Sequence, residues 1–329
     1  MQGMKGVLKS TFKYTVILLI TGGLLYSAFK DIKFVDILET WKGARKGPIL
    51  FSGVVVLLSH YFRALRWKLL LNPMGYKFST VNSYLSVLSG YAVNIIVPRG
   101  GEISRCITLN KLEGVPVRQG LGTVIAERII DLIFLISSVA LAFVIEFDVL
   151  LELINTSIEK VPDQKGKGGL FVVVVFSVSV LFFASILTFV LKSRIRKVLK
   201  LRVKIKSFLI GMKQGVLSIF RLEHNVLFFF YTFLIWGLYF LMAYFVIIAF
   251  PETESLGLEG ALMVFVFGAI AMAVPLPGGA GSYHTIVPTG INMLYDIPKS
   301  AGTAFATIFH AWQTAVHLIV GALALVISQ

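Results

Sequence analysis

The chain is poor in the residue types on which most soluble folds and metal sites depend. Only 15% of its 329 residues are charged, against about a quarter in a typical soluble domain. Cys106 is the only cysteine, which excludes an internal disulfide. The five histidines are scattered, and His310 and His317, seven positions apart, have no clear third ligand nearby in sequence. We therefore expect neither a metal site nor a cofactor.

Catalytic and nucleotide-binding motifs are also missing. The sequence contains no H-E-x-x-H pair, no G-x-S-x-G nucleophile elbow and no G-x-x-x-x-G-K-S/T phosphate loop. We expect no catalytic residue and no enzymatic activity. A transferase embedded in the membrane is therefore disfavoured. No nucleotide site is visible, so an activity driven by nucleotide hydrolysis is not expected.

Long apolar runs dominate the sequence instead. Hydrophobic residues make up 57% of the chain, and the mean hydropathy is +0.84, which indicates an integral membrane protein. The formal net charge is +14, but the basic residues lie in short segments between apolar runs, as the positive-inside rule and anionic lipids favour. Nucleic acid binding would need a basic face on a soluble domain and is not expected. We expect a multi-pass protein of the cytoplasmic (inner) membrane.

The apolar runs predict an all-α polytopic protein with about six to eight transmembrane helices. A helix needs about 20 apolar residues to cross the hydrocarbon core. Runs that fit a span are Tyr14–Phe29, Pro48–Leu71, Gly122–Ile145, Gly169–Leu191, Val226–Phe250 and Ala301–Ser328. Ser79–Arg118 and Gly260–Pro298 are expected to form re-entrant hairpins, and the alternative is eight plain spans in which each hairpin is replaced by a crossing helix.

Two proline-glycine breaks interrupt the apolar sequence. The first is Pro98-Arg99-Gly100-Gly101-Glu102 and the second is Pro277-Gly278-Gly279-Ala280-Gly281, with the two prolines 179 positions apart. Such residues are tolerated at membrane depth where the backbone is buried in protein or lines a wet cavity. Paired broken helices in two halves point to a transporter's binding site. We therefore predict one membrane domain of two inverted halves, residues 1–165 and 166–329.

Charge bias predicts the sidedness of this arrangement. Lys192–Lys206 carries eight basic residues and no acid, which favours the cytoplasm, whereas Pro251–Glu259 carries three glutamates and no base. The first hairpin would then enter from the cytoplasm, the second from outside, and the loop Lys30–Lys46 would lie outside. The basic stretch alternates with apolar residues, a pattern typical of a membrane surface, although a topogenic role explains it equally well.

Ionisable residues near the first break are candidates for headgroup binding. Guanidinium groups suit phosphate, and glycine lets the backbone approach a ligand closely. Phosphate would be held by Arg99, Arg105 and Arg128, while Glu102, Glu127 and Asp131 would hold those arginines or bind a cationic group. The alternatives are a solvated cytoplasmic turn at the break and, for the start of the Gly122–Ile145 helix, an internal ion pair or an interfacial position near water.

The last span carries a polar stripe. Its members are spaced by four, three, four and three residues, which places them on one helical face: Thr303, Thr307, His310, Thr314 and His317. Two histidines facing lipid would be costly, so the stripe should face a polar path inside the protein. The alternative is a helix–helix interface in which these side chains form local hydrogen bonds.

These observations define one candidate substrate site. The basic and aromatic end of the second span, Arg63–Lys68, is not included, because that pattern is typical of a membrane interface. The predicted site comprises Asn94, Pro98, Arg99, Gly101, Glu102, Arg105, Glu127, Arg128, Asp131, Pro277, Gly278, Gly279, Gly281, His284, Thr307, His310, Thr314 and His317.

Four segments in this order resemble the lysylphosphatidylglycerol synthase transmembrane region, also called the flippase-like family. They are Ala64–Leu71, Asn94 with Pro98–Glu102 and Arg105, Glu127–Asp131, and Pro275–Gly281. The resemblance covers about residues 10 to 327. One departure is that many relatives carry a glutamate where Ser282-Tyr283-His284 stands here, so the headgroup preference implied by the family does not transfer directly.

The resemblance implies a lipid flippase that moves a phospholipid or a lipid-linked headgroup between leaflets. The implied partners are an anionic or aminoacylated phospholipid or a polyprenyl-linked lipid. Gln329 directly follows the last expected span, so we expect this chain to lack the soluble aminoacyl transferase part of some relatives. The alternative function is a non-catalytic membrane scaffold that docks a separate glycosyl- or aminoacyl-transferase on the basic surface Lys192–Lys206.

Overall fold

The computed structural model consists of helices joined by turns and loops, with no strand in the part of the chain that it describes. The expected span Gly169–Leu191, the basic stretch Lys192–Lys206 and the junction between the two expected halves lie outside that part. The described residues are 15, 19–30, 32–147 and 224–329.

One order of helix lengths occurs twice along the chain: a long helix, two shorter helices and another long helix. A short helix at Leu19–Phe29 precedes them. The helices that follow are α2 (Phe34–Gly43), α3 (Lys46–Leu71), η1 (Asn72–Met74), α4 (Thr80–Ile96), α5 (Gly101–Glu113), α6 (Val117–Ile145), α10 (Asn225–Ile247), η2 (Glu254–Leu256), α11 (Gly257–Ala273), η3 (Pro277–Gly279), α12 (Ser282–Tyr295) and α13 (Lys299–Ile327). Of these, α2 was not expected, because its segment was interpreted as a loop.

Five helical segments are long and apolar enough to cross a membrane, which confirms the all-α polytopic fold. They are Lys46–Met74, Val117–Ile145, Asn225–Ile247, Glu254–Ala273 and Lys299–Ile327. Within the described residues, α3, α6, α10 and α13 correspond to four of the predicted spans. The helix at Leu19–Phe29 covers the second part of the predicted first span.

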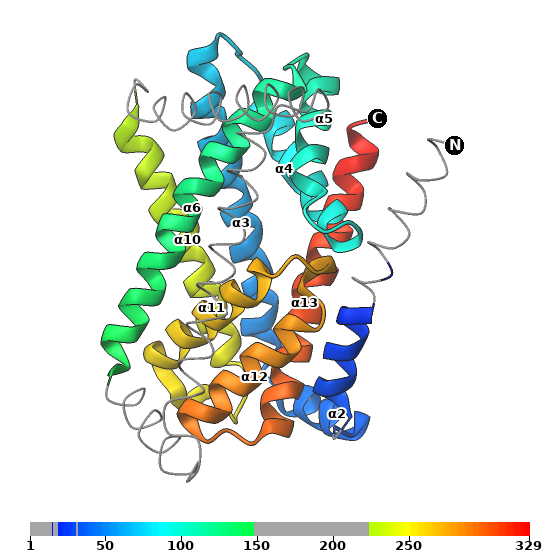
Figure 1. Ribbon diagram of the computed structural model, residues 1–329, viewed down its shortest axis with the longest axis vertical. Coiled ribbons are helices and arrows are strands. Elements are labelled where there is room, and N and C mark those ends of the chain that lie inside the picture. The colour runs from blue at the N-terminus through cyan, green and yellow to red at the C-terminus, as the bar shows by residue number, and fades with distance from the viewer. Residues whose placement is uncertain (1–14, 16–18, 31, 148–223) are drawn as a thin grey trace, which may run out of the picture.

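The second set of helices runs in the opposite direction to the first (Figure 1). α3 rises to the end of the molecule drawn at the top, α4 and α5 form a hairpin that descends from there and returns, and α6 runs down. α10 also runs down, α11 and α12 form a hairpin from the bottom, and α13 rises. α3 and α10 begin at Lys46 and Asn225, which repeats the 179-residue offset of the two prolines.

The tips of the two hairpins meet near the middle of the molecule (Figure 1). Arg99 Nη2, in the first tip, donates a hydrogen bond of 2.8 Å to the carbonyl oxygen of Ala273, at the end of α11. Gly278, in the second tip, lies so near α4 that a Cβ there would be 3.6 Å from Ile95 Cα. Because α4 has 17 residues and α5 has 13, these lengths fit a re-entrant hairpin better than two plain spans.

Glycine allows the two arms of the first hairpin to pack closely. A Cβ on Gly101 would lie 2.1 Å from the carbonyl oxygen of Gly90 and 2.6 Å from Asn94 Cγ. Instead, the backbone N–H of Gly101 donates to Asn94 Oδ1 at 2.7 Å. Small residues at helix contacts are the usual way to bring membrane helices together, because lipid provides no hydrophobic drive. This contact fixes where α5 begins and therefore where Arg105 lies.

Candidate functional site

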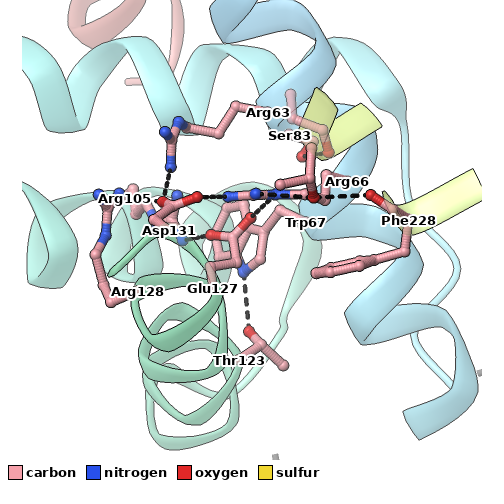
Figure 2. A network of polar contacts seen from close by, with 12 residues as sticks. Arg63, Arg66, Trp67, Ser83, Arg105, Thr123, Glu127, Arg128, Asp131 and Phe228 are labelled. Atoms are coloured by element: carbon pink, nitrogen blue, oxygen red, sulfur yellow. Dashed lines mark hydrogen bonds and ion pairs between the residues drawn. The ribbon is translucent and has the colours of Figure 1, made fainter. Parts of the chain in front are cut away.

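Five buried side chains from three helices form an arginine–carboxylate cluster (Figure 2). These are Arg63 and Arg66 of α3, Arg105 of α5, and Glu127 and Asp131 of α6. Asp131 accepts hydrogen bonds from Arg63 Nη1 at 2.9 Å and from Arg66 Nη2 at 2.8 Å. Glu127 accepts from Arg66 Nε at 3.4 Å and pairs closely with Arg105. Each carboxylate therefore bridges two arginines.

The cluster carries one excess positive charge. The side chains of Arg66 and Glu127 are fully buried, and that of Arg63 is 4% exposed. Three arginines face two carboxylates, so one guanidinium charge has no acidic counterpart inside the cluster. Uncompensated charge at membrane depth is costly, at about 3 kcal/mol on insertion scales. An anionic group brought to this place would remove that excess.

Helical spacing and packing hold the cluster in place. Arg63 and Arg66 are three apart on α3, and Glu127 and Asp131 are four apart on α6, so each pair shares one helical face. The Arg105 guanidinium lies 4.4 Å from the ring centre of Trp67. The indole N–H of that tryptophan donates to Thr123 Oγ1 at 2.9 Å.

A further helix, α10, closes the cluster on another side. Arg66 Nη1 donates to Thr232 Oγ1 at 3.2 Å, and its guanidinium lies 5.6 Å from the ring centre of Phe228. Arg63 Nη2 donates to the Tyr239 hydroxyl at 3.1 Å. The cluster therefore joins helices of the first half to α10 of the second half.

A partly exposed pair lies at the rim of the cluster. Arg128 Nε is 3.8 Å from Glu102 Oε1, and Arg128 Nη1 is 3.5 Å from Asp131 Oδ2. The Arg128 side chain is 40% exposed. Among the described residues, the Nε groups of Arg63, Arg105 and Arg128 have no hydrogen-bond partner. Because Arg128 Nε faces Glu102, the buried Nε groups of Arg63 and Arg105 are the donors that an additional acceptor, such as a phosphate oxygen, would satisfy.

Two arginines of the cluster were not among the site residues predicted from the sequence. The expectation that Arg63–Lys68 lies at a membrane interface is wrong for Arg63 and Arg66, since both side chains are buried against α6 and α10. The physical reason is that each finds a carboxylate partner inside the protein. The available signal was the three-residue spacing of two arginines within an apolar helix, which would be costly against lipid.

The hairpin tips gather a second set of predicted residues, apart from the cluster. Arg99 has a left-handed backbone (φ 62°) and binds the Ala273 carbonyl oxygen rather than a member of the cluster. Pro98 precedes it in the same turn. In the opposite tip, Pro277 begins η3, and the three glycines that follow all have positive φ: Gly278, Gly279 and Gly281.

Two histidines line the second tip. His310 Nε2 lies 2.8 Å from the carbonyl oxygen of Gly278. The rings of His284 and His310 have centres 4.8 Å apart, and His284 Nδ1 accepts from the backbone N–H of Gly281 at 3.4 Å. The α13 stripe thus contacts the tip through its third member.

The α13 stripe is also connected to the cluster, through its last member, His317. His317 Nε2 lies 2.9 Å from His60 Nε2 of α3, and the Tyr91 ring stacks on His60 at 3.9 Å. The hydroxyls of Tyr91 and Tyr239 are 3.3 Å apart, and Tyr239 receives the bond from Arg63. Thr307 hydrogen-bonds within α13, to the Thr303 carbonyl oxygen, and Thr314 is half-buried. His60, Tyr91 and Tyr239 were not predicted.

No group of three or more histidine, cysteine, aspartate or glutamate side chains suited to a metal ion occurs among the described residues. The free donors of the cluster are guanidinium N–H groups, which cannot ligate a metal. The arrangement is instead suited to an oxyanion.

Comparison with known proteins agrees with this membrane fold. The sequence profile of the lysylphosphatidylglycerol synthase TM region matches residues 14–321. A UPF0104 membrane protein of Methanocaldococcus jannaschii, MJ1595, is 28% identical over 122 residues. That alignment covers 36% of this chain and 36% of the relative, so the chain matches about a third of the relative's length. No solved structure matches the sequence. Because the profile spans nearly the whole chain, this protein belongs to the lysylphosphatidylglycerol synthase TM region family.

Proposed function

We propose that this protein moves an anionic phospholipid, or an anionic lipid-linked headgroup, between the leaflets of the cytoplasmic membrane. The observation that carries the proposal is the excess positive charge of the arginine–carboxylate cluster. A phosphate next to Arg63 and Arg105 would accept from their unused Nε donors. It would also neutralise the guanidinium charge that Glu127 and Asp131 leave over.

The depth of the cluster supports a headgroup rather than a soluble anion. Arg63 lies eight residues before the end of α3, which corresponds to about 12 Å along the helix axis at 1.5 Å per residue. A phosphate at this depth lies below the membrane surface on the side where α3 ends. Lipid phosphates reach such a position when a headgroup leaves the interface and begins to cross.

The hairpins suggest how such a headgroup would proceed. They approach from opposite ends and meet at the contact of Arg99 with Ala273 (Figure 1). If the hairpins separated on one side of a bound headgroup and closed on its other side, the barrier would pass the headgroup. Transporters built from inverted repeats work in this way. The proposed activity is transport, not an enzymatic reaction, and it would be passive or ion-coupled.

Exchange of labelled lipid between leaflets tests the proposal. The purified protein would be reconstituted in vesicles of phosphatidylglycerol and phosphatidylcholine that contain a trace of headgroup-labelled fluorescent lipid. A membrane-impermeant quencher then reports how much label has reached the inner leaflet. We expect exchange with wild type and a strong loss with Arg105→Gln, which removes one guanidinium of the cluster.

Arg45→Gln provides the matched control. Arg45 lies outside the cluster, and its side chain is 59% exposed and paired with Glu254. This variant should retain exchange. Native mass spectrometry of the same proteins, with Arg99→Ala and Glu127→Gln, would show which lipid class remains bound. Equal exchange by Arg105→Gln and Arg45→Gln would refute the headgroup role, and specific lipid binding without any exchange would favour the scaffold function.

A further inference from the structure

A histidine pair at membrane depth lies next to the arginine–carboxylate cluster. His60 is 1% exposed within α3, and its Nε2 atom lies 2.9 Å from Nε2 of His317 in α13. His317 is partly exposed, so it is the member of the pair that a proton can reach. Ionisable side chains are costly inside a membrane, and those of pumps and transporters often bind and pass protons. The pair is therefore a candidate proton site.

The hydrogen bonds of Ser59 assign the tautomers of the pair. Ser59 Oγ donates its only hydrogen to the carbonyl oxygen of Val56 at 2.6 Å. Towards His60 Nδ1, which is 3.5 Å away, this hydroxyl can therefore only accept. His60 then has its hydrogen on Nδ1, its Nε2 accepts, and Nε2 of His317 donates. Nδ1 of His317 keeps its lone pair, and a proton added there leaves the bond between the rings intact.

The side chains around the pair provide no acid that would balance this proton. Among the described residues, no carboxylate contacts either ring, and no ionisable group of α2 or α12, which also pack on α13, does so. The ionisable groups that face the pair are Arg63 of α3, Tyr91 of α4, Tyr239 of α10 and, two turns earlier in α13, His310. The fixed charge closest to the pair along α3 is therefore a positive one.

Arg63 connects the charge of the pair to the charge of the cluster. It follows His60 by three residues, so the two side chains lie on one face of α3. The cluster has one excess positive charge, which repels a second positive charge on the histidine pair. An anion bound at the cluster removes this repulsion, so the anion and the proton favour each other's binding. Such a coupling is reciprocal and is typically about 5–150-fold.

We propose that the histidine pair binds one proton together with the anion and that the two cross the membrane together. This inference rests on the proposed function and names the ion to which the transport is coupled. The proton binds Nδ1 of His317 when the anion neutralises the cluster, and it leaves when the anion is released and the repulsion returns. A singly charged headgroup and its proton are together neutral, so the membrane potential does not oppose their crossing.

Titration of the purified protein in mild detergent tests the binding step. The probe is dioctanoyl phosphatidylglycerol, and a pH indicator in weakly buffered solution records proton uptake between about pH 5 and 8, where histidine ordinarily titrates. We expect wild type to take up protons as the lipid binds, and to bind about tenfold more tightly at the acid end of this range. The phosphodiester of the probe stays ionised throughout, so it does not contribute to this difference.

His317→Gln removes the proton site and preserves the contact. An amide keeps a donor and an acceptor for His60 but does not titrate, so this variant should bind the lipid without proton uptake and with one affinity across the pH range. His224→Gln is the matched control, because His224 is exposed at the start of α10, outside the pair and the cluster. It should take up protons as wild type does.

A pH gradient across vesicles tests the coupled movement. The vesicles contain phosphatidylglycerol, phosphatidylcholine and a trace of headgroup-labelled phosphatidylglycerol, and their interior is held about one pH unit more alkaline than the outside. Coupled movement should concentrate the label in the inner leaflet, by up to about tenfold for this gradient. His317→Gln should leave the label evenly distributed, and vesicles without protein give the background.

Three results would overturn the proposal: no proton uptake by wild type, equal uptake by wild type and His317→Gln, or an even distribution of label under a maintained gradient with wild type. The last of these leaves the proposed function standing, because the label still crosses. If no label crosses in any vesicles, the proposed function fails, and the coupled crossing fails with it even where the titration shows proton uptake.

Discussion

His60 of α3 and His317 of α13 form a hydrogen-bonded pair, with their Nε2 atoms 2.9 Å apart. Tyr91 of α4 stacks on both rings, at 3.9 Å and 5.0 Å between centres. One imidazole donates and the other accepts, so the pair satisfies two polar groups that would otherwise be unpaired at membrane depth. This contact joins the first half of the chain to the polar stripe of α13.

The histidine pair predicts coupled effects on stability. His317→Ala should lower the free energy of unfolding by about 1–3 kcal/mol, because it leaves the buried His60 without its partner. Replacing both histidines by alanine should cost less than the sum of the two single changes to alanine. Thermal unfolding in a mild detergent measures this cycle, and strictly additive costs would show that the two rings do not depend on each other.

The arginine–carboxylate cluster predicts a larger effect. Asp131→Asn removes the charge that Arg63 and Arg66 share, and breaking a buried pair in this way typically costs about 3–5 kcal/mol. The variant carries additional uncompensated positive charge, so phosphatidylglycerol should raise its unfolding temperature more than that of wild type. Phosphatidylcholine serves as the control lipid, and equal shifts with both lipids would contradict an anion-binding cluster.

The backbone at the tip of the first hairpin predicts that a glycine variant is more stable than an alanine variant. Arg99 has φ 62°, a conformation that glycine adopts freely and other residues adopt with strain. Arg99→Gly and Arg99→Ala both lose the bond to the Ala273 carbonyl oxygen. Arg99→Gly should nevertheless be the more stable variant by about 1 kcal/mol. The reverse order in thermal unfolding would show that the turn does not hold this conformation.

Much of the fold could be predicted because apolar run length and glycine-proline breaks are local signals. The expected run Pro48–Leu71 became α3, within two residues at both ends, and the hairpin expected from Ser79 begins with α4 at Thr80. The two breaks also lie at the tips of the hairpins, with Gly278 beside Ile95. Each of these features depends on a few consecutive residues, which a single sequence reveals.

The site was less predictable, because the residues that pair within it come from distant segments of the chain. Asp131 and Glu127 were identified, but their partners on α3 were assigned to the membrane interface. Nothing near Arg66 in the sequence shows that a carboxylate lies 61 residues later on a facing helix. His60 was missed for the same reason, since its partner His317 is 257 residues away. The α13 stripe was visible only because helical periodicity places its members on one face.

Close packing at Gly101 predicts that even the smallest side chain is not tolerated there. A Cβ would lie 2.1 Å from the Gly90 carbonyl oxygen, so α4 and α5 would have to separate. Gly101→Ala should therefore destabilise the protein by about 1–3 kcal/mol, as overpacking does. Gly122→Ala, at an open position, is the control and should be neutral or stabilising because alanine favours a helix. Equal unfolding temperatures for the two variants would refute the close contact.

The orientation of the two hairpins predicts opposite accessibility of the two ends of the molecule. Cys106 is buried and is the only cysteine, so a Cys106→Ala background would carry single new cysteines without interference. Lys77 and Glu252 are both exposed, and they lie next to the outer ends of α4 and α11, from which the hairpins enter. In intact cells, an impermeant maleimide should label Glu252→Cys but label Lys77→Cys only after the membrane is opened. Since α4 and α11 run in opposite directions toward one meeting point, labelling of both cysteines from the same side would be incompatible with hairpins that enter from opposite faces. The reversed pattern would keep the hairpins but place the end of α3 outside.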